Sequence, residues 1–275
     1  MKTILKGLTA LALGLGISGA ASAAEYPIYE PIEQSWSFAG PFGTYDRGQL
    51  QRGFQVYRES CAACHGLDRV AFRNLSTLGY SEEQIIALAA EYEVEDGPDS
   101  FGDMFMRPAI PADRFPDPFP NAEAAAAANN GAAPPDLSLM AKARHAERGF
   151  PRFVIDIFTQ YEAAGADYIY SLLQGYQEAP EGYELQPGTY YNPYFLAGTS
   201  LSMPQPFSDG MLSYNDGSPE TIHQYSRDVA AFLMWTAEPH LEARKQTGFV
   251  VMIFLLLFGG LVYMSKRKVW AAVPH

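Results

Sequence analysis

The two cysteines of the chain lie three positions apart and are followed at once by a histidine, in the stretch CAACH that runs from Cys61 to His65. Upstream, apolar residues recur at helical spacing after Asp46, which can cap a helix with Gln49 three positions later. The sequence therefore predicts a helix of about four turns whose end brings both thiols and the imidazole to one place. The rest of the fold must be built around whatever those three side chains hold.

C-x-x-C-H is the attachment signal of a c-type haem, in which the cysteines form thioethers and the histidine binds iron. Other sites fit less well. A structural zinc site needs four ligands, and the sequence offers no second cysteine or histidine pair. A redox dithiol needs a βαβ setting, and a disulfide across so small a loop gains little and leaves the histidine without a role. We expect one covalent haem c on Cys61 and Cys64, with His65 as an axial iron ligand.

An electron carrier needs a second axial ligand, and a methionine thioether raises the potential and closes the iron site. The candidates between the two apolar ends of the chain are Met104, Met106, Met140, Met203, Met211 and Met234. Met203 lies in a loop-like stretch next to Pro204, which favours it over Met234 in a helical pattern. Spacing alone leaves the other methionines open.

Two apolar segments indicate export and membrane anchoring. Lys2 and Lys6, a short apolar run and a small-residue cleavage site at 21–23 are typical of a signal peptide. Near the other end, Thr247 to Ser265 is a run of 19 residues without charge, which spans about 28 Å as a helix. Basic residues at 266–268 follow it and favour a cytoplasmic C-terminus.

These signals divide the chain into four parts. We expect a signal peptide at 1–23, an exported domain at 24–245, a transmembrane anchor at 246–265 and a cytoplasmic tail at 266–275. The formal net charge of −12 argues against nucleic acid as a partner and suits a basic protein. The acidic window 91–103, which contains no basic residue, is either a solvated loop or a docking patch.

Helix signals dominate the rest of the exported part, with long irregular connections and no convincing strand. Proline-rich stretches at 108–120 and 178–211 predict extended or loop structure. Further helices are expected over 81–95, from Asn121 to Asn129, over 137–147, within 152–175, and from Ser218-Pro219-Glu220 to Glu238.

Several stretches in this order resemble the cytochrome c1 family, the haem-bearing subunits of cytochrome bc1 complexes. They are RGFQVYRESCAACHGLDRVAFRNL, EDGPDSFGDMFMRPA, AANNGAAPPDLSLMAKARH, YIYSLL, NPYFLAGTSLSMPQPF and DVAAFLMWTAEPHLEARKQTGF. The resemblance covers nearly the whole mature chain. It implies a class I cytochrome c-like haem domain with long loop insertions, mostly α, and one C-terminal transmembrane helix.

The resemblance also assigns roles to single residues. Met203 falls at the family's distal methionine, and Arg144 at an arginine near a haem propionate. Asn129 and Pro135 match positions that line the haem pocket. In the class I fold the helix before C-x-x-C-H crosses the C-terminal helix of the domain, and the residues that fit that crossing are Gly53, Phe54 and Trp235.

The implied function is one-electron transfer from the Rieske iron–sulfur protein to a soluble cytochrome c, in a dimeric complex with cytochrome b. The chain itself would not be an enzyme. It would be a single-pass protein of the bacterial inner membrane, with its haem domain in the periplasm. Two alternatives are an anchored carrier acting outside the complex and a haem enzyme such as a peroxidase, which would need an exchangeable iron site.

One stretch departs from the mitochondrial pattern. The segment between His145 and Tyr168 is longer than its mitochondrial counterpart and resembles the bacterial members. The sequence predicts no path for this insertion, and no cysteine is left over to hold it with a disulfide.

Overall fold

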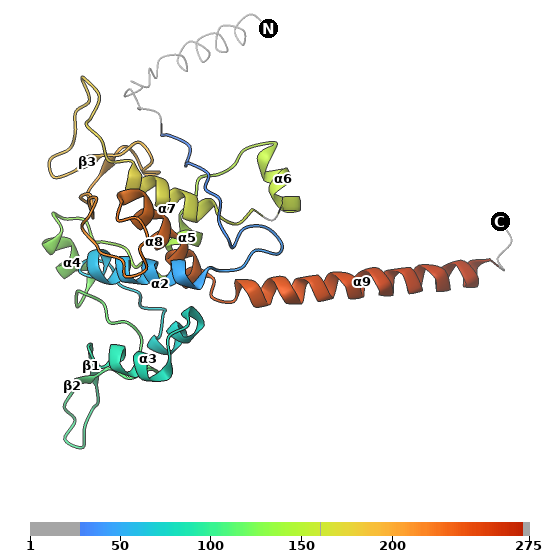
Figure 1. Cartoon of the computed structure of the whole chain (residues 1–275), viewed down its shortest axis with the longest axis horizontal. Helices are drawn as coiled ribbons and strands as arrows, with labels where there is room; N and C mark the ends of the chain where they lie inside the picture. The colour runs from blue at the N-terminus through green and yellow to red at the C-terminus, as the bar shows by residue number, and fades with distance from the viewer. Residues whose placement is uncertain (1–27, 160, 272–275) are drawn as a thin grey trace, which may run out of the picture.

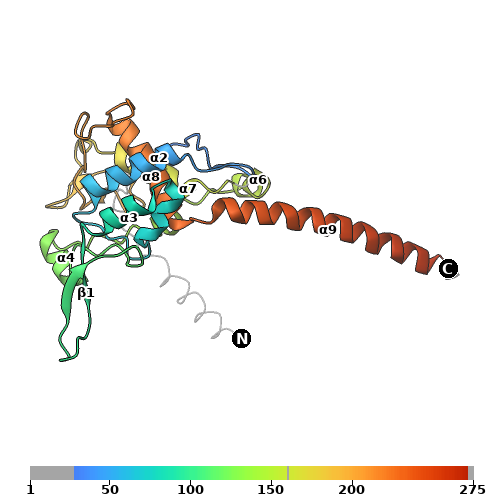
Figure 2. The same ribbon diagram turned by 60° about the horizontal axis from the view of Figure 1, so that its bottom comes forward.

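The protein is a helical body from which one long helix projects. The computed structural model describes residues 28–159 and 161–271, so the predicted signal peptide and the end of the predicted tail lie outside the described residues. The long helix, α9 (Leu241–Trp270), leaves one side of the body and runs away from it in both views (Figures 1 and 2). The prediction of a mostly α fold with one long apolar C-terminal helix is confirmed.

The body is made of short helices and two small sheets. The helices of its described part are α2 (Arg47–Val56), the π-helical turn η1 (Tyr57–Cys61), the 3-10 helix η2 (Phe72–Leu78), α3 (Glu82–Ala89), α4 (Ala122–Ala128), α5 (Met140–Ala143), α6 (Arg152–Thr159), α7 (Ala164–Gln174) and α8 (Ile222–Ala237). The antiparallel pairs are β1 (Glu93–Asp96) with β2 (Phe105–Pro108), and β3 (Tyr190–Tyr191) with β4 (Ser200–Leu201). Helix α8 contacts α2, α5 and α7 and is the centre of the core.

Helices α2 and α8 pack backbone to backbone at Gly53. A Cβ atom on Gly53 would lie 2.1 Å from the carbonyl oxygen of Asp228 and 2.6 Å from Cβ of Phe232, so only glycine allows this approach. The rings of Phe54 and Phe232 lie beside it with centroids 5.6 Å apart. The predicted crossing is therefore present, but Asp228 and Phe232 occupy its centre. Trp235 stacks on Phe232 three residues further along α8.

The predicted helix over 81–95 is wrong in its second half. Ser81 caps α3 as its spacing indicates, but the helix ends at Ala89. Beyond it, β1 and β2 form a hairpin whose tip contains Gly97 and Gly102, both with positive φ. Backbone conformations of that kind favour glycine and end helices. The hairpin projects from the body, away from α9 (Figure 2).

Two other helix starts differ from their predictions. Over 137–147 only α5 is helical. The Asp136 carboxylate accepts from the Ser138 amide and also from the Asp68 amide, and the Ser138 hydroxyl accepts from the Arg69 amide, so the segment is held against the stretch after CAACH. Helix α8 begins at Ile222 and is capped by Thr221 rather than Ser218. The expected start is tied down elsewhere, since Glu220 accepts a hydrogen bond from the Tyr214 amide.

Helix α9 is long and apolar enough to cross a membrane. Its apolar stretch has a mean hydropathy of 2.3 and none of it is buried against the body. Pro239 lies between α8 and α9, where the sequence predicts a break, and α9 begins at Leu241, several residues before the apolar run. The start of α9, as far as Phe249, thus contacts the body, and the longer part of the helix projects away from it (Figure 1).

Candidate functional site

The CAACH stretch forms a tight turn at the end of α2. The helix passes into the π-helical turn η1, whose last residue is Cys61. The amides of Cys64 and His65 both donate to the Cys61 carbonyl, at 3.0 and 2.9 Å. Below them, the hydroxyl of Tyr57 donates to the His65 carbonyl at 2.9 Å. The side chains of Cys61, Cys64 and His65, which are predicted to act together, therefore project from one short turn that is closed by hydrogen bonds.

A distant segment, residues 135–138, holds this turn in place and is called the strap below. The carboxylate of Asp136 accepts from the Asp68 amide at 2.8 Å, and the hydroxyl of Ser138 accepts from the Arg69 amide at 3.1 Å. The amide of Leu137 donates to the Gly66 carbonyl at 2.9 Å. Residues 135–138 thus hold the segment that follows His65 with hydrogen bonds on successive residues.

The same strap sets the state of the His65 ring. Nδ1 of His65 lies 2.7 Å from the carbonyl oxygen of Pro135. A carbonyl only accepts hydrogen bonds, so Nδ1 carries the proton and Nε2 keeps its lone pair. Burial lowers the pKa of His65 below its ordinary value, against the opposing effect of the Pro135 carbonyl. The ring is therefore held as a neutral, oriented imidazole, the form that binds metals.

The thiols have no other chemical role that their setting supports. Both cysteines are free and partly buried. Burial, together with a smaller effect of Cys64, raises the pKa of the Cys61 thiol to about 12. Redox-active cysteines have lowered pKa values in electropositive surroundings, so the redox-dithiol interpretation is disfavoured by the structure as well as by the sequence.

Burial reduces the set of candidate methionines. Met234 is fully enclosed in α8, and Met104, Met106 and Met211 are exposed to solvent. Met140 and Met203 are partly buried and pack against the edge of the core, as does Cys61. The loop at Met203 is positioned by Tyr176, whose hydroxyl donates to the carbonyls of Met203 at 3.0 Å and Pro204 at 3.2 Å.

The other predicted pocket residues have mixed settings. Arg144 ends α5, is exposed, and makes no ion pair within the part of the chain that the structure describes. It lies near Tyr168, whose pKa is raised by burial and lowered by the charge of Arg144. The side-chain amide of Asn129 is used within its own helix, where it donates to the Ala125 carbonyl. Pro135 acts through its carbonyl on His65 rather than through its ring.

The donor set fits a c-type haem. The end of one helix presents two free thiols, and a neutral imidazole beside them is oriented by a backbone carbonyl. Partly buried thioethers lie elsewhere at the edge of the core, and Arg144 is a cation without a carboxylate partner among the described residues. The described residues form no cluster of histidine, cysteine and acidic side chains that would hold a bare metal ion instead.

Sequence reasoning missed the residues that hold the site from outside the motif. They are Tyr57, Asp136, Ser138 and Tyr176, whose side chains form hydrogen bonds with backbone groups 8 to 69 positions away. Asp136 and Ser138 lie at the start of the helix that the sequence predicts over 137–147. Nothing in the spacing indicates that these side chains bind the backbone about seventy positions upstream.

The acidic window lies in the β1–β2 hairpin and is only partly neutralised. Arg107 forms ion pairs with Asp96 and Asp113, and Arg58 binds Glu91 at 2.7 Å. The remaining acids of the hairpin that make no ion pair within residues 28–159 and 161–271 are Glu93, Glu95, Asp99 and Asp103. Asp99 instead accepts from the amides of the turn.

The helical body with this site and a projecting apolar helix defines a membrane-anchored c-type cytochrome. The family model for the cytochrome C1 family matches residues 36–273. The chain therefore belongs to the cytochrome c1 family, whose members carry a covalently bound haem c and are electron-transfer subunits of the cytochrome bc1 complex. This is the family that the sequence blocks around CAACH resemble, so that prediction is confirmed.

Relatives from three bacteria are similar over most of the chain. A cytochrome c1 of Rhodospirillum rubrum is 46% identical over 292 residues that cover all of both chains. A cytochrome c1 of Blastochloris viridis is 46% identical and covers 98% of this chain and 97% of its own. A cytochrome b/c1 of Bradyrhizobium diazoefficiens is 58% identical over 88% of this chain, which spans about a third of that longer relative, 36% of its length.

Proposed function

We propose that this chain relays single electrons through one haem c within a quinol–cytochrome c oxidoreductase complex. Cys61 and Cys64 attach the haem, and His65 and Met203 are its axial ligands. The observation that carries the proposal is the Pro135 carbonyl 2.7 Å from Nδ1 of His65, which leaves Nε2 as the donor at the end of the cysteine-bearing turn. Haem c bound there supplies an iron that is reversibly oxidised and reduced by one electron.

The side chains of the site orient the haem and tune its redox potential, and they do not make or break bonds of a substrate. Residues 135–138 keep the His65 ring in one tautomer and one orientation, and Tyr57 holds its backbone from the other side. Tyr176 holds the Met203 loop. Arg144 compensates the negative charge of a propionate. The chain is accordingly a redox subunit and not an enzyme on its own.

Replacing the distal ligand tests this assignment. Met203→Leu removes the thioether while keeping volume and apolar character, so we expect loss of the low-spin His–Met spectrum and binding of CO. The matched control is Met211→Leu, since Met211 is exposed and its replacement should leave the spectrum unchanged. A normal spectrum in Met203→Leu would identify another ligand, and Met140→Leu would then be the variant to measure. CO binding by the unsubstituted protein would favour a haem enzyme.

The topology that accompanies this function has the haem domain on the outside of the bacterial inner membrane. Residues 1–23 are a cleaved signal peptide, 24–245 the periplasmic domain, 246–265 the span, and 266–275 a cytoplasmic tail. The charges at 266–268 and the export signal support the same orientation. Protease treatment of spheroplasts tests it, because an intact haem domain after treatment would contradict exposure in the periplasm.

The partners of this function are cytochrome b, the Rieske iron–sulfur protein as electron donor, and a soluble cytochrome c as acceptor, in a dimeric complex. Purification in mild detergent separates this from an anchored carrier acting alone. Co-purification with a b-type haem subunit supports the complex. A chain that runs as a single subunit under those conditions would support the solitary carrier.

The hairpin is the proposed docking surface for a basic cytochrome c. Its unpaired carboxylates raise the rate of encounter at low ionic strength. Glu95→Lys with Asp103→Lys should therefore slow reduction of the soluble cytochrome several-fold at low salt and little at high salt. The control Glu147→Lys reverses one charge on an exposed site of the insertion, so each single variant of the hairpin, Glu95→Lys and Asp103→Lys, is compared with it as well. Equal rates for the hairpin variants and the control at low salt would remove the hairpin from the docking surface.

A further inference from the structure

Residues 146–163, which make up most of the insertion between His145 and Tyr168, expose large apolar side chains. The exposed fraction is 81% for Phe150 and 52% for both Phe153 and Ile155. Helix α6 carries two of them. Measured along the axis of α9, α6 lies at the same height as the first turns of α9 in both views, although it is set off to one side of that helix (Figures 1 and 2). Isolated exposed apolar residues are ordinary, but three within six positions on one projecting segment call for a partner surface.

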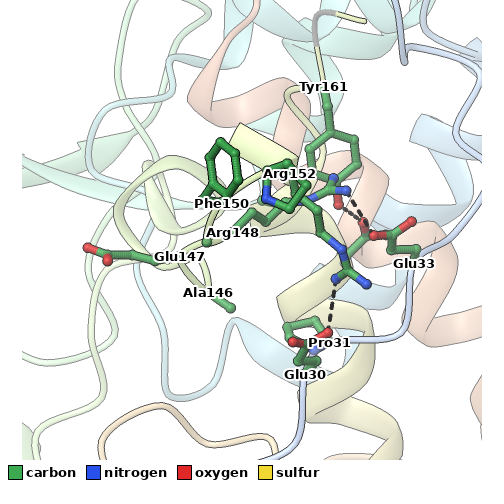
Figure 3. Close-up of a pocket in the computed structure, with 13 residues that line it drawn as sticks. Glu30, Pro31, Glu33, Ala146, Glu147, Arg148, Phe150, Arg152 and Tyr161 are labelled. Atoms are coloured by element: carbon green, nitrogen blue, oxygen red, sulfur yellow. Dashed lines mark hydrogen bonds and ion pairs between the residues drawn. The ribbon is translucent and has the colours of Figure 1, made fainter. Parts of the chain in front are cut away.

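Two arginines of the insertion form ion pairs with the N-terminal part of the body. Arg148 forms ion pairs with Glu33 at 3.1 Å and Asp156 at 3.4 Å, and its guanidinium lies 3.9 Å from the ring centre of Tyr161. Arg152 binds Glu30 at 2.9 Å. Figure 3 shows these arginines reaching toward Glu30 and Glu33, while the Phe150 ring points away from them. The insertion is therefore oriented, with its ionic contacts on the body and its phenyl rings outward.

The end of the insertion is fastened to the base of the span. Arg244 in the first turn of α9 binds both carboxylate oxygens of Glu162, at 2.8 and 2.7 Å. The uncharged run of α9 starts at Thr247, three residues later, or about 4.5 Å along the helix axis. The exposed rings are thus held close to the level at which α9 enters the hydrocarbon.

A second segment reaches the same level independently. Lys245 donates to the carbonyls of Phe38 and Gly43, at 2.7 and 3.3 Å, and so fixes the loop that carries Phe42. Phe42 is 76% exposed, and its ring centroid lies 5.9 Å from that of Phe249, which belongs to the uncharged run. A side chain that touches the membrane-spanning part of α9 must lie at the membrane surface when the helix is inserted.

We propose that Phe42, Phe150 and Phe153 form a lipid footing, a set of rings that enters the interfacial layer of the bilayer around the base of α9. Aromatic rings at this depth bury apolar area while the polar backbone stays among the headgroups. A single span alone leaves a domain free to tilt and rotate. The lipid footing, fixed through Arg244 and Lys245, sets the height and tilt of the haem-bearing body over the membrane.

Lipid-depth measurements on single cysteines test the proposal. In the haem-loaded complex in lipid nanodiscs, Phe42→Cys and Phe150→Cys are labelled with an environment-sensitive fluorophore. The control Phe101→Cys lies on the hairpin, where Phe101 is 89% exposed. We expect labels at 42 and 150 to be quenched several-fold more than the label at 101 by lipids with a spin label near the headgroup, and several-fold less by aqueous iodide. The unsubstituted complex measures background labelling.

A fourth label separates this proposal from the topology on which it depends. Leu256→Cys lies in the middle of the uncharged run, so quenching there by a deep spin label shows that α9 is in the bilayer. If position 256 is quenched and position 150 behaves like position 101, the lipid footing is wrong while the anchor stands. If labels at 42 and 150 are protected from both quenchers, a neighbouring subunit covers them and the lipid proposal is overturned. Failure at 256 would overturn the anchor itself.

Discussion

The crossing of α2 with α8 and the insertion at residues 146–163 are held in the body by different kinds of contact. At the crossing, two backbones touch at Gly53 and aromatic rings fill the space around it. In the insertion, the contacts to the rest of the body that fix its direction are ion pairs and hydrogen bonds of Arg148, Tyr161 and Glu162. The crossing carries the cysteine turn, and the end of the insertion is ion-paired with the first turn of α9.

This difference separates a rigid part of the molecule from an adjustable one. Close packing of buried rings tolerates almost no change in distance, so the helix that ends in CAACH is fixed in one position relative to α8. Ion pairs that are partly exposed are weak and depend on salt, so the insertion can respond to its surroundings. Close packing of buried rings suits a site that must hold a cofactor in one geometry. Partly exposed ion pairs suffice for a surface that meets the lipid bilayer.

The largest effect is expected from adding one methyl group at the crossing. Gly53→Ala would place a Cβ atom 2.1 Å from the Asp228 carbonyl oxygen, so α2 and α8 must separate. Overpacking of this kind costs about 3 kcal/mol of the free energy of unfolding, measured by chemical denaturation. Gly48→Ala in the same helix is the control. It meets no atom closer than 3.4 Å and should gain up to about 1 kcal/mol from helix propensity. Equal stability of the two variants would contradict the close approach.

A smaller and local effect is expected in the insertion. Arg148→Gln removes the ion pairs with Glu33 and Asp156 and the contact with the Tyr161 ring, so we expect a loss of about 1–2 kcal/mol of local stability. Hydrogen exchange over α6 should speed up about tenfold, while exchange over α2 stays unchanged.

Arg152→Gln is the matched control for this variant. Its ion pair with Glu30 joins two exposed side chains, so its loss should cost about 0.5 kcal/mol or less. Raising the salt concentration should weaken α6 in the unsubstituted protein and leave α2 protected. Faster exchange over both helices would show that the crossing and the insertion unfold as one unit.

The smallest effect concerns the buried carboxylate at which the insertion joins the core. Asp167 accepts hydrogen bonds from Trp36 Nε1 at 2.7 Å, from the Gln34 amide at 2.8 Å and from the Tyr161 hydroxyl. Burial raises the pKa of Asp167 above its ordinary value, although these hydrogen bonds act in the opposite direction. Between the unfolded pKa of about 3.9 and the higher folded pKa, the folded chain binds more protons. The free energy of unfolding therefore falls as the pH rises through this interval.

Asp167→Asn should abolish this pH dependence and keep the fold, because an amide of the same shape can accept from Trp36 and donate to the Tyr161 oxygen. Chemical denaturation of both proteins from about pH 4 upward measures the effect. The stability of the unsubstituted protein relative to Asp167→Asn should decline with rising pH and then level off. A difference that grows with pH would mean that the folded pKa lies below the unfolded value.

The parts of the fold that the sequence predicted are those encoded by local spacing. Each of four features can be recognised from residues that are neighbours in the sequence. They are the Asp46 cap, the helix into Cys61, the Asn121 cap of α4 and the apolar run of α9. The hairpin was missed because each strand has only four residues and none of them is fully buried, so the apolar pattern is too short and weak to predict a strand. The start of α8 was misplaced because a hydrogen bond to Glu220 holds the expected first turn in a loop.

For the site, the sequence by itself determined the chemistry: two thiols and an imidazole at a helix end, on a chain with one uncharged run long enough to cross a membrane. These are properties of residue type and short spacing. Only the tertiary structure decided that the Pro135 carbonyl, seventy residues away, sets the tautomer of His65, and that α8 lies against Gly53. It also decided that the charged side of the insertion faces the body. Such contacts join segments far apart in the chain, and no local pattern encodes which backbone group a side chain will meet.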